Sequence, residues 1–399
     1  MTTRSSSLRP FASPGAPRAR IVLAHDWLVG MRGGERVLDA IARALAGVPG
    51  VHVAGLFVMF DDTHSLSRSI DALPHVCSTL GRLPWASTRL RRWLLPLYPA
   101  AVADLSRRLA RLHARTPIDL VISTSSAAIK GLLPPQGVPH LCYCHSPARY
   151  VWSQRENYSR DHSLRGLGLS MFGDRFRRWD ARSAASVSEF IANSSHTRDE
   201  IRRCYSRESK ILFPPVRTEF FTPPAQTRTL DGPWLVASAL EPYKRTELAI
   251  EAARRANREL LVVGDGSERR RLERLAGPHT RFLGRLGDER LRELFRSASL
   301  LIFPQVEDFG IMAVEAQAAG LPVVARRAGG ALDTVVDGVT GAFFDGDDPD
   351  AIVAAAGRCP KNCDRACREN ALRFSEEAFR AGLLSLVGEA CPKLLSRPG

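Results

Sequence analysis

Short apolar segments alternate with helical segments along most of the chain, and this alternation restricts the possible folds more than any other feature. Runs that are apolar throughout suit parallel strands covered by helices on both faces, so the pattern predicts an α/β protein built from βαβ units. Amphipathic stretches at 33–47, 244–257 and 288–298 are predicted helices. The predicted strands are IVLAHD (21–26), VHVAGLFV (51–58), IDLVIST (118–124), PHLCYCH (139–145), EFIANSS (189–195), PWLVASAL (233–240), ELLVVG (259–264), SLLIFP (299–304) and PVVA (322–325).

A proline-rich segment, FPPVRTEFFTPPAQTRTLDGP (213–233), interrupts the alternation and indicates a linker or hinge. A chain of 399 residues is also too long for one ordinary core and suits two domains. Each half is therefore predicted to form a doubly wound parallel sheet, with ligands bound in the cleft between the carboxyl ends of the two sets of strands. The predicted divisions are a disordered tail (1–19), an N-terminal domain (20–212), a linker (213–232), a C-terminal domain (233–372) and a C-terminal helix (373–399).

The first twenty residues, MTTRSSSLRPFASPGAPRAR, are rich in Ser, Pro and Arg and contain no apolar core, so they do not resemble a secretory signal. An organelle transit peptide of similar composition is the alternative to a disordered tail. No run approaches the roughly 18–20 apolar residues that span a bilayer. The eight cysteines show no zinc or disulfide spacing, and we expect reduced, structural thiols in a cytosolic compartment.

Two groups of cysteines have a regular spacing. Cys142 and Cys144 alternate within an apolar run, which predicts that both lie on one face of a strand. Cys359, Cys363 and Cys367 recur every four residues, which predicts one face of a helix. Three thiols could bind a metal ion, but no fourth ligand is indicated, and no metal site is predicted.

The formal net charge is +14, and all of the excess lies before residue 223, because basic and acidic residues balance from there on. A basic half indicates an anionic partner such as nucleic acid, anionic lipid or a phosphorylated substrate. A general preference for arginine in the coding sequence is the alternative. No nucleic-acid-reading motif accompanies the charge, so no nucleic-acid partner is expected.

The chain contains neither a full G-x-G-x-x-G nor a P-loop, which argues against dinucleotide dehydrogenases and P-loop kinases or ATPases. Candidate anion sites lie instead where strands lead into helices. Gly33 and Gly34 open a predicted helix, and Lys244 and Arg245 open another. His145 ends a predicted strand and is expected to point into the cleft. An ordinary glycine turn, a surface Lys-Arg pair and a structural histidine are the alternatives.

The segment PQVEDFGIMAVEAQAAGLP (304–322) holds two carboxylates, Glu307 and Glu315, beside apolar positions. Burying a carboxylate without a partner is costly. A helix is predicted to begin near Gly310, with free amides around the Phe309-Gly310-Ile311 turn forming an anion site. The two glutamates could then accept hydrogen bonds from sugar hydroxyls, while the alternative is that both face solvent.

These motifs resemble glycosyltransferase family 4, whose members are retaining enzymes of GT-B fold, over about residues 20–390. The resemblance lies in HDWLVGMRGGERVLDAIARAL, YCHSPARYVWSQRENY, ANSSHTRDEI, FPPVRTEFF, PYKRTELAIEAA, VGDG and EDFGIMAVEAQAAGLPVVARRAGGALDTVVDGVTGAFF. The GGERV and HSP forms resemble the branch that acts on lipid-linked oligosaccharides, often mannosyltransferases of polysaccharide or O-antigen assembly. The resemblance implies an acceptor-binding N-terminal domain, a nucleotide-sugar-binding C-terminal domain and a C-terminal helix that packs back towards the N-terminal domain.

The resemblance also implies roles for single residues. Glu307 would hold hydroxyls of the donor hexose, and Glu315 would hold the ribose of the nucleotide. The amides of Gly310 and Ile311, together with Lys244, would stabilise the leaving diphosphate. Preorganised cations and helix amides are the expected catalysts where negative charge develops on a departing group.

The remaining implied roles complete the site. Gly33 and Gly34 would lie near the diphosphate and the acceptor, and His145 near the reacting sugar. Arg245 and Phe309 would belong to the donor site. His145, Lys244 and Glu307 are thus the expected catalytic residues, with a nucleotide-sugar co-substrate, no other cofactor and no metal.

The sequence departs from the family pattern at two positions. Ala239 stands where the family has an arginine that binds phosphate, and Asp333 replaces a glutamate in the GGxxE pattern. The expected function is transfer of a hexose, mannose from GDP-mannose, to a lipid-linked glycan in polysaccharide or O-antigen biosynthesis. The alternative that Ala239 motivates is a non-catalytic GT-B protein that binds a glycan or a partner transferase.

A basic and aromatic stretch from 82 to 115 fits the lipid-linked acceptor. Arg89, Arg91, Arg92 and Trp93 beside leucines are typical of a segment that lies on anionic lipid. The expected location is therefore cytoplasmic and peripheral, on the inner face of the plasma membrane. A solvated helix face next to a core patch is the alternative.

Overall fold

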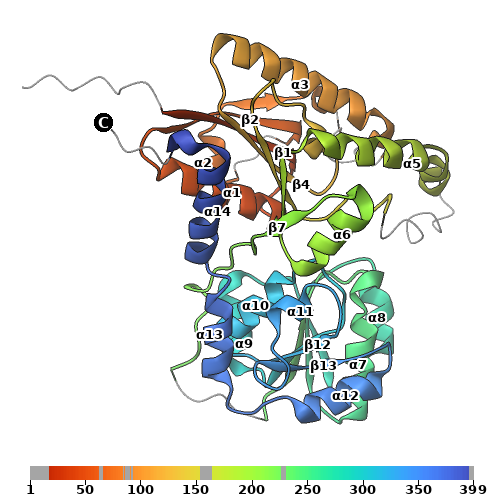
Figure 1. Ribbon diagram of the computed structural model, residues 1–399. Helices are drawn as coiled ribbons and strands as arrows, with labels where there is room; N and C mark the ends of the chain where they lie inside the picture. The colour runs from red at the N-terminus through yellow and green to blue at the C-terminus, as the bar shows by residue number, and fades with distance from the viewer. Residues whose placement is uncertain are drawn as a thin grey trace, which may run out of the picture.

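Two parallel β-sheets, one in each half of the chain, organise the computed structural model (Figure 1). The structure describes residues 18–62, 66–83, 85, 90, 93–152, 164–225 and 231–394, with the backbone alone for 164–172. In Figure 1 the N-terminal domain lies above the C-terminal one, and the last helix rises from the second domain along the first.

The N-terminal sheet has seven parallel strands in the order β3-β2-β1-β4-β5-β6-β7. The order reverses between β1 and β4, and such a switch point is where open α/β sheets bind ligands. The strands are β1 (Ala19–Leu28), β2 (Val51–Asp61), β3 (His75–Cys77), β4 (Leu120–Ser125), β5 (His140–Cys144), β6 (Glu189–Ala192) and β7 (Ser209–Ile211), and the helices are α1 (Gly33–Ala46), α2 (Arg68–Asp71), α3 (Tyr98–Arg115), α5 (Leu164–Ser183) and α6 (Ser195–Tyr205).

The C-terminal sheet has six parallel strands in the order β10-β9-β8-β11-β12-β13, and its switch point lies between β8 and β11. The two-domain α/β architecture predicted from the alternation of elements is confirmed. The strands are β8 (Trp234–Ala237), β9 (Leu260–Val263), β10 (Thr280–Gly284), β11 (Leu300–Phe303), β12 (Val323–Arg326) and β13 (Gly341–Phe344), and the helices are α7 (Thr246–Arg255), α8 (Arg269–Leu275), α9 (Asp288–Ser297), α10 (Ile311–Ala318), α11 (Ala331–Thr334), α12 (Pro349–Arg358), α13 (Asp364–Leu372) and α14 (Glu376–Ala390).

Both faces of each sheet are covered, which explains why the central strands are apolar at successive positions. In β1, Ile21 and Leu23 point to the α1 side, whereas Val22 and Ala24 point to the α3 side. The apolar stripe of each helix closes one of these two cores. Alternate residues of one strand therefore belong to separate cores, as expected for a buried parallel strand.

The segment between the two sheets, expected as a linker over 213–232, is closely packed in its described part. Val216 and Phe221 are fully buried in the core of the C-terminal domain. The amide of Val216 donates a hydrogen bond of 2.9 Å to the carbonyl of Phe374, so the two crossings between domains run side by side. Beyond this point, α14 buries Phe379 and Leu383 in the N-terminal core against α1.

At the N-terminus, residues 1–17 of the expected tail lie outside the described residues, and Ala19 already belongs to β1. Within the described parts of the chain, no helix combines the length and the apolar character needed to cross a membrane.

The prediction that three cysteines share a helix face is wrong. Helix α12 ends at Arg358, and α13 begins only at Asp364, with Cys363 as its N-cap. Pro360 lacks an amide donor, and Asn362 has a positive φ of 54°, so the helix cannot continue through this stretch. Cys142 and Cys144 do share one face of β5, in the same core cluster.

Candidate functional site

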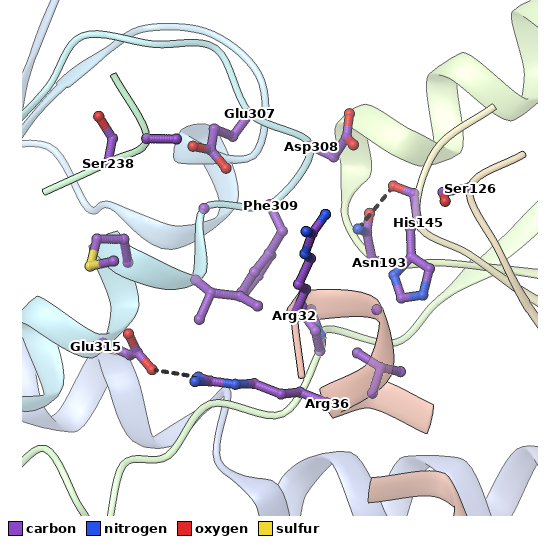
Figure 2. Close-up of a pocket in the computed structure, with 18 of the residues that line it drawn as sticks. Arg32, Arg36, Ser126, His145, Asn193, Ser238, Glu307, Asp308, Phe309 and Glu315 are labelled. Carbon is purple, nitrogen blue, oxygen red and sulfur yellow. Dashed lines mark hydrogen bonds and ion pairs between the residues drawn. The ribbon is translucent and has the colours of Figure 1, made fainter. Parts of the chain in front are cut away.

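A cleft of about 500 Å³ lies between the two domains. Its walls include the loops that follow β1, β4, β5, β6, β8 and β11, because the carboxyl ends of both sheets face each other here. Figure 2 shows side chains from both domains pointing into this space. The described lining residues are Met31, Arg32, Gly33, Gly34, Arg36, Val37, Ser126, His145, Arg149, Asn193, Pro214, Ala237, Ser238, Ala239, Lys244, Glu307, Asp308, Phe309, Gly310, Ile311, Met312 and Glu315.

Two helices begin at the cleft from opposite domains. Helix α1 starts at Gly33 and α10 starts at Ile311, and a Cβ atom built on Gly33 would lie 3.8 Å from Cδ1 of Ile311. Gly310, the N-cap of α10, has a φ of 92° that favours glycine. Because the first amides of a helix have no partner within it, both helices direct positive potential into the cleft.

The loop that carries Glu307 is fixed by direct backbone contact with the start of α11. The amide of Gly330 donates a 2.8 Å hydrogen bond to the carbonyl of Glu307. A Cβ on Gly329 would lie 2.4 Å from that carbonyl oxygen, and one on Gly330 would lie 2.3 Å from Cα of Phe309. Only glycine fits at either position, which gives the AGG sequence a structural reason.

Both glutamates have cationic partners, and these ion pairs offset the free-energy cost of removing the carboxylates from water. Glu307 forms an ion pair with Lys244. Glu315 is 4% exposed and lies 3.2 Å from Arg217 and 3.8 Å from Arg36. Burial raises the pKa of Glu315, and the two arginines oppose that rise. Sequence reasoning missed both arginines, since neither stands near the glutamate in the chain.

Two histidines flank the start of α1. A Cβ on Gly34 would lie 3.3 Å from Cε1 of His25 and 3.6 Å from Nε2 of His145. The pKa of His145 is lowered to about 3, mainly by burial and to a smaller extent by His25 and Arg149. Its ring is therefore neutral at pH 7. Its Nε2 is buried and has no hydrogen-bond partner among the described residues. A neutral imidazole here can form a hydrogen bond with a ligand but cannot act as a cation.

Among the described residues, polar contacts at three places join the domains around the cleft. Arg149 forms an ion pair with Asp308, and Arg36 reaches Glu315. Asp333 accepts hydrogen bonds of 2.8 and 2.9 Å from the amide and hydroxyl of Ser195, at the start of α6. Asp333, the acidic residue of the GGALD sequence, therefore forms hydrogen bonds with the N-terminal domain and does not line the cleft.

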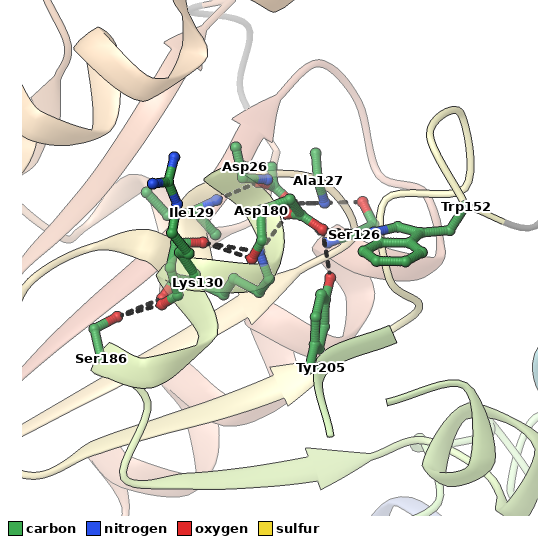
Figure 3. A network of polar contacts seen from close by, with 12 residues as sticks. Asp26, Ser126, Ala127, Ile129, Lys130, Trp152, Asp180, Ser186 and Tyr205 are labelled. Carbon is green, nitrogen blue, oxygen red and sulfur yellow. Dashed lines mark hydrogen bonds and ion pairs between the residues drawn. The ribbon is translucent and has the colours of Figure 1, made fainter. Parts of the chain in front are cut away.

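A second polar network supports the N-terminal wall of the cleft (Figure 3). The carboxylate of Asp26 accepts hydrogen bonds of 2.6 to 2.9 Å from four successive amides, those of residues 126–129. Next to this loop, Lys130 and Asp180 form a fully buried ion pair, and Asp180 also accepts hydrogen bonds from Trp152 and Tyr205. This network fixes the loop after β4, which presents a side chain to the cleft.

Most of the predicted site residues gather in this cleft, but Arg245 does not. Its backbone is left-handed, with a φ of 53°, and its guanidinium lies 2.9 Å from both Glu247 and Asp347. The change of backbone direction after the Pro242–Lys244 turn sends neighbouring side chains to different sides. Phe309 lines the cleft but is mostly buried, with its ring packed against Phe374.

The predicted membrane-contact residues lie elsewhere. Arg89, Arg91 and Arg92 lie outside the described residues. Trp93 is 45% exposed and is not part of the cleft. In the described part of the chain, no three His, Cys, Asp or Glu side chains gather as metal ligands would.

Two family models match the chain, one in each domain. Residues 31–220 match Glycosyltransferase Family 4, and residues 232–376 match Glycosyl transferases group 1. Among curated proteins, the D-inositol 3-phosphate glycosyltransferase of Streptomyces avermitilis is 33% identical over 199 residues, which are 42% of this chain and 43% of that protein. The GDP-mannose-dependent alpha-(1-6)-phosphatidylinositol monomannoside mannosyltransferase of Mycolicibacterium smegmatis is 33% identical over 202 residues, 43% of this chain and 52% of that protein. The chain thus spans about half the length of these relatives.

Solved structures share the whole two-domain architecture. Sucrose-phosphate synthase from Thermosynechococcus elongatus superposes with a TM-score of 0.69 at 20% identity, covering 93% of this chain and 98% of the other. WaaG, a glycosyltransferase involved in lipopolysaccharide biosynthesis, gives a TM-score of 0.63 at 16% identity, covering 92% and 99%. Each domain thus resembles one glycosyltransferase family model, and the chain as a whole has the two-domain GT-B fold of these solved structures.

Proposed function

We propose that the protein is a retaining glycosyltransferase that moves a hexose from a nucleotide sugar to a lipid-linked glycan. The observation that carries this proposal is the position of Glu307 and Glu315 on either side of the α10 N-terminus, opposite Gly33 and Gly34. Mannose from GDP-mannose is the proposed donor, and the mannosyltransferase among the relatives supports that choice. The proposed pathway is assembly of a cell-surface polysaccharide or O-antigen.

The proposed mechanism uses charges that are in place before the reaction. Lys244 and the amides of Gly310 and Ile311 stabilise the negative charge that develops on the leaving diphosphate. Glu307 accepts hydrogen bonds from the donor hexose, and Glu315 accepts them from the ribose. Because a side-chain cation and helix amides neutralise the diphosphate, we propose that the reaction needs no metal ion.

His145 is proposed to contact the reacting sugar through its unpartnered Nε2. Its low pKa keeps the ring neutral over the physiological range, so it acts as a hydrogen-bonding group. Retention of the anomeric configuration is part of the same proposal, and the anomer of the product tests it.

The acceptor is proposed to reach the N-terminal domain from a membrane surface. The side chains of Trp85 and Leu97 are 67% and 48% exposed, in the same stretch as Trp93. Exposed aromatic and aliphatic side chains within a basic segment are typical of contact with anionic lipid. We therefore propose a cytoplasmic protein that binds peripherally to the inner face of the plasma membrane.

The test is incubation of the folded protein with labelled GDP-, UDP- and ADP-sugars and a polyprenyl-diphosphate-linked glycan. Transfer from GDP-mannose, with the α-configuration retained in the product, is the expected result. A protein with native circular dichroism that transfers sugar from no donor would overturn the proposal. Flotation with vesicles containing anionic lipid, compared with neutral vesicles, tests the membrane contact separately.

A second candidate is a GT-B protein that binds a glycan or a partner transferase without catalysis. Ala239 favours it, because this position lines the cleft with only a methyl group. The Ala239→Arg variant separates the two candidates. A gain in turnover indicates a weakened active site, whereas no turnover in either form supports binding alone.

A further inference from the structure

We propose that Arg32, in the N-terminal domain, is a second cation for the diphosphate of the donor and acts across the cleft from Lys244. This inference rests on the proposed function, because the ligand is the diphosphate of a nucleotide sugar. Four observations carry it: the balance of charges in the cleft, the direction of the Arg32 side chain, the small side chain of Ala239 and the engagement of Arg245 elsewhere.

The cationic side chains that line the cleft differ in whether a carboxylate neutralises them. Lys244 is paired with a glutamate, Arg149 with an aspartate and Arg36 with a second glutamate. Arg32 is exposed, and among the described residues its guanidinium has no carboxylate or hydrogen-bond acceptor. The hydrogen bonds of Arg32 are made by its backbone, whose amide donates to the carbonyl of Gly30 and whose carbonyl accepts from the amide of Arg36. Arg32 therefore supplies the uncompensated positive side-chain charge of this cleft.

The side chain of Arg32 is directed to the place where an anion would bind. Arg32 is the N-cap of α1, yet its side chain makes no capping hydrogen bond and is free to project from the helix. Figure 2 shows it reaching from α1 past Phe309 towards the loop that bears Glu307 and Asp308, the loop that leads into α10. A guanidinium presents a fork of donors that matches two phosphate oxygens.

The C-terminal domain offers the diphosphate fewer cations than its sequence indicates. Ala239 contributes no charge to the cleft, and Arg245 is held by two carboxylates outside it. Lys244 is therefore the cation that this domain contributes to the described lining of the cleft. A second cation has to come from the opposite domain, so the complete diphosphate site forms only when both domains face each other.

The test compares a nucleoside diphosphate with its nucleoside. Wild type, Arg32→Ala and Arg32→Lys are titrated calorimetrically with GDP and guanosine, and with the uridine and adenosine pairs. Arg107→Ala, which changes an exposed arginine of α3 outside the cleft, is the matched control. Arg32→Ala is expected to weaken the diphosphate at least about tenfold and leave the nucleoside unchanged, with Arg32→Lys in between.

A rescue variant sharpens the test. Ala239→Arg places a cation on the opposite wall, so it is expected to restore diphosphate affinity in the Arg32→Ala background. Equal diphosphate affinity in wild type and Arg32→Ala would overturn the inference, as would an equal loss for the nucleoside. If wild type binds none of the three diphosphates, the proposed function fails, which is a different result.

Discussion

Replacing Arg217 by methionine tests how the buried carboxylate of Glu315 is stabilised. Arg217 donates to Glu315 at 3.2 Å, and the only other cation near that carboxylate in the described structure is Arg36 at 3.8 Å. Removing one partner of a buried ion pair costs about 3–5 kcal/mol, and because Arg36 remains we expect about 3 kcal/mol for Arg217→Met at pH 7.5. Thermal unfolding should show this as a fall in Tm of several degrees.

The pH dependence identifies the cause of that loss. Burial already raises the pKa of Glu315, and losing Arg217 raises it further. A carboxyl group whose folded pKa lies above its unfolded pKa loses stability as pH rises from the unfolded value, about 4.3, through the folded value. The Arg217→Met penalty should therefore be larger at pH 7.5 than at pH 5, because the raised pKa favours the uncharged carboxyl group as the pH falls.

Two further variants complete the experiment. Glu315→Gln in the Arg217→Met background removes the charge and should recover most of the lost Tm at pH 7.5. Asp288→Asn removes the other, exposed partner of Arg217 and should cost less than about 1 kcal/mol. The reasoning is refuted if the Arg217→Met penalty is the same at both pH values, or if Glu315→Gln fails to recover stability.

In a urea titration, Gly330→Ala should lower the free energy of unfolding by more than 2 kcal/mol, because the new Cβ would lie 2.3 Å from Cα of Phe309; the variant should also lose donor binding. Gly277→Ala is the control and should be nearly neutral, because nothing lies within 4 Å of its new Cβ. The ring of His145, with its pKa lowered to about 3, should keep one set of NMR shifts from pH 5 to 8; an inflection near 6.5 would contradict the burial argument. Lys130→Met should lower the free energy of unfolding by about 3–5 kcal/mol, because it leaves the fully buried Asp180 charge without its partner. In chemical denaturation, adding Asp180→Leu should recover part of that loss. Equal instability of the single and double variants would contradict this explanation.

The elements that could be predicted from the sequence share a physical property. The central strands β1, β4, β8 and β11 are buried on both faces, so their sequences are apolar at successive positions and are easily recognised. Four strands were missed, and all four are edge strands: β3, β7, β10 and β13. Three of them contain partly or largely exposed residues, and an edge strand pairs on one side only, so the apolar signal there is weak or short.

The site residues also fall into a group that could be predicted from the sequence and a group that could not. Residues that act through local backbone, such as Gly310 at the start of α10, could be placed from their spacing alone. The partners of the carboxylates could not, because Arg36 and Arg217 come from distant parts of the chain and meet Glu315 only in the folded protein. Lys244 and Arg245 were both predicted to bind the donor, but Arg245 itself has a left-handed backbone, and its side chain lies outside the cleft.

The side-by-side crossings at Val216 and Phe374 mean that the C-terminal domain is an insertion within the N-terminal one, between β7 and α14. Phe379, Leu383 and their neighbours in and just after α14 fill a core whose remaining members lie before residue 213. During synthesis, the N-terminal domain therefore cannot complete its core until α14 has left the ribosome. All strands of the inserted C-terminal domain are synthesised before α14. This domain can therefore complete its fold before the N-terminal domain does, although its synthesis starts later.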